Sequence, residues 1–123
     1  MKILCCCAGG NCRSVGLAYL LKDFWHIDAL ALGLATVSGP ETRTMLFEWA
    51  DHIIPCTDEV NHGHVPEQYQ PKTSLWDVGP DRWGNSLHPE LLSLYIPTVL
   101  ESFGPPVPEH RQTVERLRSI VHG

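Results

Sequence analysis

Short apolar segments alternate with helical patterns along this chain, and that alternation restricts the possible fold more than any other feature. The apolar segments end at glycines, prolines or polar loops, and the stretches between them repeat apolar residues with helical spacing. The expected strands are Ile3–Cys6, Asp28–Gly33, His52–Cys56 and Thr73–Asp77, and the expected helices run from residue 13 onward, over 41–50, over 88–103 and over 109–122. This order predicts an α/β fold with three layers, a four-stranded, mainly parallel sheet and helices on both of its faces.

The length and composition indicate a small globular protein. The chain has 123 residues, 43% of them apolar, so we expect one domain over residues 1–123. We find neither a long apolar run nor a signal-peptide pattern, and four of the five cysteines cluster near the N-terminus instead of forming a disulfide framework. These features predict a cytoplasmic protein with no membrane partner. The net charge of −5 argues against a nucleic-acid partner.

The segment Cys5–Gly16, CCCAGGNCRSVG, carries most of the chemistry. A zinc site is disfavoured, because adjacent strand cysteines point to opposite faces and no second cysteine pair follows. The remaining ligand-like cluster, His62 and His64, lies in a polar loop. A nucleotide loop is also disfavoured, since GGN does not match the glycine patterns of dinucleotide or ATP sites. We therefore expect neither a metal nor another cofactor.

The spacing between Cys7 and Arg13 points instead to an anion site with a nucleophile. Five intervening residues can curl so that their backbone N–H groups converge on an anion at the N-terminus of the following helix. Arg13 offers a planar fork to two phosphate oxygens, and Ser14 could hydrogen-bond a Cys7 thiolate. Cys5 and Cys6 lack an arginine at this spacing and are expected in the core. The alternative is a buried strand followed by an ordinary glycine turn. The intervening residues are Ala8, Gly9, Gly10, Asn11 and Cys12.

At these residues the chain resembles the low-molecular-weight protein tyrosine phosphatase family, which carries a C-x5-R-S loop after its first strand. The resemblance covers about residues 1–103 in the order of elements. It implies that Asp81, in the late loop VGPDRWG, is the general acid and that Trp83 lines the substrate pocket. It also implies that Cys12 can form a reversible disulfide with Cys7; the alternative is that Cys12 simply fills the underside of the loop.

Two positions depart from the family pattern. Gly10 stands where the family has its loop asparagine, with Asn11 one position later. Arg82 replaces the proline that follows the acid, which puts the placement of Asp81 in question and adds a cation beside the pocket. Asp77 is the rival candidate for the acid, with a turn-capping role as its alternative.

The resemblance implies a metal-independent phosphatase that cleaves phosphotyrosine or small aryl phosphates through a phosphocysteine on Cys7. Arg13 would hold the phosphoryl oxygens, and the expected substrates are phosphorylated proteins or aryl phosphate monoesters. Two other functions stay open at this point. One is an arsenate reductase on a similar fold, which would need Cys56 in a thiol relay. The other is a phosphate- or phosphoprotein-binding module without turnover.

Overall fold

The computed structural model describes residues 1–8, 12–34, 39–57, 65–80 and 82–122. Three parallel strands form its sheet: β1 (Lys2–Cys7), β2 (Asp28–Gly33) and β3 (His52–Pro55), in the order β2-β1-β3. The central strand β1 pairs with both neighbours, so that Cys6 lies opposite Leu32 on one side and Pro55 on the other. The parallel α/β architecture predicted from the sequence is therefore confirmed.

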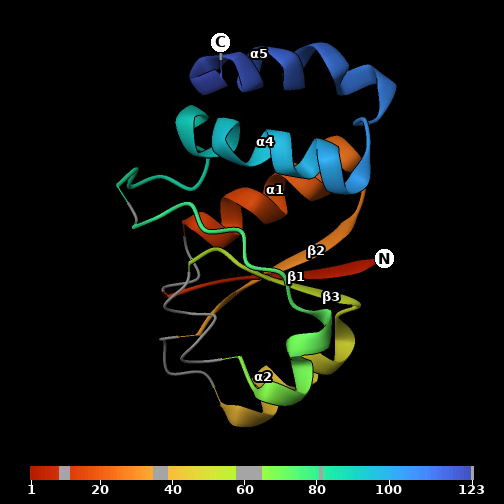
Figure 1. The fold of residues 1–123 in the computed structure, drawn as a ribbon, viewed down its shortest axis with the longest axis vertical. Helices are drawn as coiled ribbons and strands as arrows, with labels where there is room; N and C mark the ends of the chain where they lie inside the picture. The colour runs from red at the N-terminus through yellow and green to blue at the C-terminus, as the bar shows by residue number, and fades with distance from the viewer. Residues whose placement is uncertain (9–11, 35–38, 58–64, 81, 123) are drawn as a thin grey trace.

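Helices cover both faces of this sheet. Helices α1 (Arg13–Trp25), α4 (Pro89–Phe103) and α5 (Arg111–His122) lie on one side, whereas α2 (Pro40–Trp49) and the 3-10 helix η1 (Glu67–Lys72) lie on the other (Figure 1). Strand alternation divides the cysteines between the two faces: Cys5 and Cys7 belong to the core cluster beneath α1 and α4, and Cys6 to the cluster beside α2.

The expected strand Thr73–Asp77 is not a regular strand in the structure. Only Thr73 forms a bridge, in parallel with Ile53. The chain nevertheless follows the edge of β3, because the backbone N–H groups of Ser74, Trp76 and Val78 donate to carbonyl groups of β3 and of Cys56, the residue after it, over 2.9–3.1 Å. The described residues thus form a three-stranded sheet with a hydrogen-bonded extended segment along one edge.

The C-terminal helices match the expected segments with small shifts. Helix α4 continues through Pro97, and a short 3-10 helix, η2 (Pro108–His110), precedes α5. Ser93 of α4 anchors α5: its buried hydroxyl donates to the Arg118 carbonyl at 2.9 Å and accepts from the Val121 N–H at 3.1 Å.

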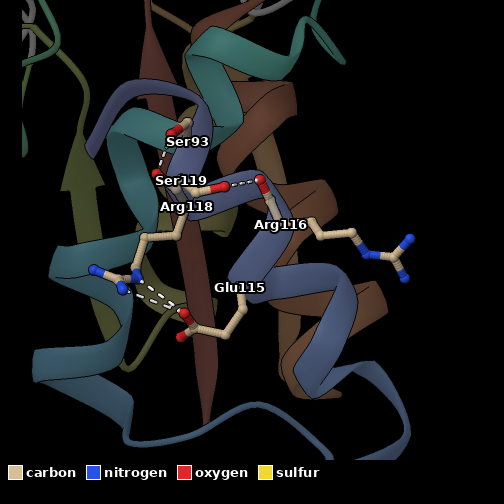
Figure 2. A network of polar contacts seen from close by, with 5 residues as sticks. All are labelled: Ser93, Glu115, Arg116, Arg118 and Ser119. Carbon is tan, nitrogen blue, oxygen red and sulfur yellow. Dashed lines mark hydrogen bonds and ion pairs between the residues drawn. The ribbon is translucent and has the colours of Figure 1, made fainter. Parts of the chain in front are cut away.

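The outer surface of α5 carries its own polar contacts. Figure 2 shows the Arg118 guanidinium paired with Glu115 one turn earlier, at 3.2 Å, and the Ser119 hydroxyl directed at the Arg116 carbonyl. These contacts stabilise the helix locally, while Ser93 ties it to α4. Over the described residues, no helix combines the length and the apolar character needed to cross a bilayer.

Candidate functional site

Cys7 ends the central strand at the carboxyl edge of the sheet, where ligands bind in open α/β folds. Cys7 is only 1% exposed, and its carbonyl accepts a hydrogen bond from the Leu34 N–H at 2.9 Å. The Sγ atom lies 3.1 Å from the Oγ atom of Ser14, which is fully buried in the first turn of α1. The sequence prediction that Ser14 reaches the Cys7 thiol is therefore confirmed as a contact.

Arg13 is the first residue of α1 and is held from two directions. Its Nη1 donates to the Gly79 carbonyl at 2.9 Å, and its own carbonyl accepts from the Tyr95 hydroxyl of α4 at 2.8 Å. Its Nε is buried, yet no acceptor for it lies among the described residues. The first turn of α1 contains no acidic side chain, so Arg13 and the helix N-terminus contribute positive potential at this corner.

Asp77 shapes the loop that receives Arg13. Its Oδ1 accepts from the Gly79 N–H at 2.8 Å, which closes a tight turn. Gly79 has φ +82°, a conformation that side-chain-bearing residues rarely adopt. Asp77 thus has the turn-capping role that the sequence offered as the alternative to catalysis.

Arg82 extends over the same loop and stacks on Trp83. Its guanidinium carbon lies 4.4 Å from the centroid of the Trp83 ring, within cation–π range. A β-carbon placed on Gly79 would lie 3.9 Å from Arg82 Nη1, so the guanidinium groups of Arg13 and Arg82 both lie near Gly79. The cation expected from the departure at this position is present beside the candidate site.

Trp83 packs inward. It is 8% exposed and belongs to the core cluster that also contains Cys7 and Cys12. Trp83 thus anchors the late loop in the core on the α1 face of the sheet, and its expected place in the wall of a substrate pocket stays a prediction.

The other cysteines have the character of core residues. Cys5 and Cys56 are fully buried, and Cys6 is equally inaccessible to solvent. Burial raises the pKa of Cys5 and Cys6 well above the usual range, and it raises the pKa of Cys56 to about 12. These thiols stay protonated at neutral pH and are therefore poor nucleophiles.

Several predicted site residues lie outside the described residues. These are Gly9, Gly10 and Asn11 of the loop and the candidate acid Asp81. The pair His62 and His64, which the sequence analysis did not favour as metal ligands, also lies outside the described residues. Ala8 is partly buried against the cluster on the α2 face, and Cys12 is buried at the start of α1. The structure thus brings together Cys7, Arg13 and Ser14, with Trp83 in the same apolar cluster as Cys7.

Three further residues that the sequence analysis did not single out build this corner. Tyr95 fixes the start of α1, Gly79 accepts from Arg13, and Gly16 permits a close approach of the late loop to α1. A β-carbon on Gly16 would lie 2.7 Å from the Ser86 carbonyl oxygen and 3.1 Å from a Leu91 methyl carbon. A glycine within an otherwise regular helical pattern is the sequence signal for such a contact.

Among the described residues, a group of side chains spaced for a metal ion lies elsewhere. His26, Glu109 and His110 form it at the opposite end of α1 from Cys7.

No protein-family model matches this chain, and searches of curated proteins and of solved structures also found no match.

Proposed function

We propose that the protein is a cysteine-dependent phosphatase that hydrolyses aryl phosphate monoesters, with phosphotyrosine as the substrate class. One observation carries the proposal: the Cys7 thiol lies 3.1 Å from the Ser14 hydroxyl where β1 leads into α1. The neighbouring Arg13 has a buried Nε without an acceptor among the described residues. A nucleophile, a fixed cation and a helix N-terminus meet at one point, as phosphoryl transfer requires.

The reaction proceeds by two in-line displacements at phosphorus. The Cys7 thiolate attacks the phosphorus atom, an S–P bond forms, and the bond to the leaving phenolate oxygen breaks while Asp81 donates a proton to that oxygen. Water then attacks the phosphocysteine with Asp81 as base, the S–P bond breaks, and inorganic phosphate leaves. Arg13 and the N–H groups of the loop stabilise the equatorial oxygens throughout.

Ser14 stabilises the Cys7 thiolate before the first displacement and again as the leaving group of the second. Its hydroxyl can donate to the anionic sulfur, and the helix N-terminus and Arg13 add positive potential. In this proposal, Trp83 contributes an aromatic wall for the substrate ring, and Arg82 contributes a second cation near the phosphate.

The expected three layers and fourth parallel strand are part of this proposal as well. A three-layer fold with a fourth parallel strand would place residues 73–77 as the edge strand beside β3, and the hydrogen bonds of Ser74, Trp76 and Val78 support that placement. The late loop would then leave the same edge of the sheet as Cys7.

Arsenate reduction is the less favoured activity. It needs a second thiolate to resolve a cysteine adduct, and Cys56 is the distant candidate. The fully buried Cys56, with its pKa raised to about 12, is a poor attacking thiol.

The deciding experiment measures p-nitrophenyl phosphate hydrolysis by the freshly reduced protein from pH 5 to 8, with EDTA present. We expect turnover in the wild type and in Cys56→Ala, the matched thiol control, and a loss of about 10³-fold or more in Cys7→Ser. Circular dichroism checks that both variants fold.

Two outcomes would overturn the proposal for this substrate class. One is the absence of turnover in the reduced wild type; tight vanadate binding in that case would identify a phosphate-binding module. The other is unchanged turnover in Cys7→Ser, which would exclude the phosphocysteine.

A further inference from the structure

Two histidines and a glutamate from separate parts of the chain meet at the C-terminal end of α1. His26 follows α1, while Glu109 and His110 belong to η2. One ligand-type atom from each residue lies within 4.8 Å of the other two. His110 Nε2 is 3.8 Å from Glu109 Oε1, and the two imidazole rings have their centroids 6.2 Å apart.

The backbone holds His26 in an unusual conformation. With φ 53°, it is the single non-glycine residue of positive φ in the described part of the chain. It caps α1, because its N–H donates to the Leu21 carbonyl, and the Ile27 N–H donates to the same carbonyl at 2.9 Å. Such a left-handed cap fixes where the imidazole leaves the helix.

The opposite side of the cluster is tied to the same helix end. The Val107 N–H donates to the Phe24 carbonyl at 2.9 Å, and Trp25 Nε1 donates to the Gly104 carbonyl at 2.9 Å. The His110 ring stands edge-on to Phe24, with centroids 5.1 Å apart. These contacts bring η2 to His26.

We propose that His26, Glu109 and His110 bind one divalent transition-metal ion of the zinc class. Two neutral imidazoles and one carboxylate form a common donor set for such ions, and water would complete a tetrahedral shell. Ligand atoms around zinc lie about 3.3–3.5 Å apart, given metal–ligand distances near 2 Å. The ligand atoms of the cluster lie within 4.8 Å of one another, and small rotations of the exposed Glu109 and His26 side chains would bring them to the separation found around zinc.

The position suits a cation for a second reason. The C-terminus of a helix carries a partial negative charge, and α1 ends at this cluster. A bound ion would cross-link the end of α1 to the segment that begins α5. Because α1 is about 20 Å long, the ion would lie far from Cys7. This inference is therefore independent of the proposed phosphatase activity.

Zinc titration of the reduced protein by calorimetry at pH 7.5 tests the proposal, with cobalt absorption as the report on ligand type. We expect one ion per chain and an upward shift of the melting temperature of about 5 °C or more at saturating zinc. The titration is repeated in Cys7→Ser, which removes the candidate nucleophile as a competing ligand. Cobalt should give visible d–d bands without a thiolate charge-transfer band.

Each ligand has a variant designed to preserve the fold. His26→Gly accepts φ 53°, His110→Phe keeps an aromatic ring against Phe24, and Glu109→Gln keeps the shape of the side chain. We expect each to weaken zinc binding about tenfold or more. His122→Gln, an exposed histidine on α5, serves as the matched control and should bind as the wild type does.

The proposal is overturned if zinc does not bind to Cys7→Ser, if a thiolate band accompanies cobalt binding, or if the three ligand variants bind zinc as tightly as His122→Gln.

Discussion

The two ends of helix α1 present opposite electrostatic environments to a ligand. At the N-terminus, the Cys7 thiol contacts Ser14 in a buried corner, and Arg13 and the positive end of the helix dipole suit that corner to an anion. At the C-terminus, His26 joins Glu109 and His110 on an exposed surface suited to a cation. The two proposed sites on this helix would therefore take ligands of opposite charge, because the helix dipole and the end groups differ in sign.

The two ends also differ in how the chain builds them. Cys7, Arg13 and Ser14 are neighbours in sequence, so a short strand–loop–helix unit contains them all. The histidine cluster joins residues from two distant segments, and hydrogen bonds such as the one from Val107 to Phe24 bring them together. The first site is therefore visible as a motif, and the second is not.

Removing the proposed acid is expected to have the largest effect on the N-terminal site. Asp81→Ala should lower kcat for p-nitrophenyl phosphate about 10²- to 10⁴-fold. Asp77→Ala should act mainly through the Gly79 turn and hence change kcat less. Pre-steady-state kinetics on both variants measure the difference, with phenyl phosphate as comparison, because its more basic leaving group depends more strongly on the acid. A larger loss in Asp77→Ala would assign the acid to Asp77.

Replacing the fixed cation should come next. Arg13→Lys keeps the charge but loses the planar fork and the bond from Nη1 to Gly79, and we expect a decrease of about 10²-fold in kcat/KM. Zinc affinity at the other end of α1 should stay unchanged, which calorimetry checks. An equal loss of zinc binding would show that the two ends are not separate sites.

Filling the close approach at Gly16 should have the smallest effect. Gly16→Ala forces the Ser86 carbonyl away from α1, which should cost about 1–3 kcal/mol of unfolding free energy, partly offset by the helix preference of alanine. Urea denaturation measures this cost. Gly39→Ala is the control, because among the described residues its β-carbon would meet Glu41 Oε2 alone, at 3.4 Å, and we expect it to cost less stability than Gly16→Ala.

Wild-type stability in Gly16→Ala would show that the late loop does not depend on this contact. If Gly16→Ala lowers kcat as well as stability, the position of the late loop matters for the proposed reaction. The same substitution should leave the histidine cluster intact, since Gly16 lies in the first part of α1.

Local patterns in the sequence predicted most of the regular structure. β2 runs over Asp28–Gly33 as expected, and α1 begins at Arg13, because strand alternation and helical spacing are short-range signals. The structure of the segment after Lys72 was harder to predict from the sequence. Its pattern favours a strand, but apart from the Thr73 bridge its pairing with β3 is carried by hydrogen bonds that do not form a regular ladder.

For the candidate site, the sequence predicted the contact between residues that are close together in the chain. Cys7 and Ser14 are only seven positions apart in the chain, whereas the contacts of Arg13 with Gly79 and Tyr95 join residues far apart in sequence. The role of Asp81 remains a prediction from the resemblance, because that residue lies outside the described part of the chain.

By itself, the sequence determined the order of strands and helices, the division of Cys5, Cys6 and Cys7 between the two faces, and the spacing that brings Ser14 to the Cys7 thiol. Each depends on backbone periodicity within a few residues. Only the tertiary structure decided that Arg13 donates to the Gly79 carbonyl and that His26 meets His110. Such contacts arise from the packing of whole elements, and no local period in the chain encodes them.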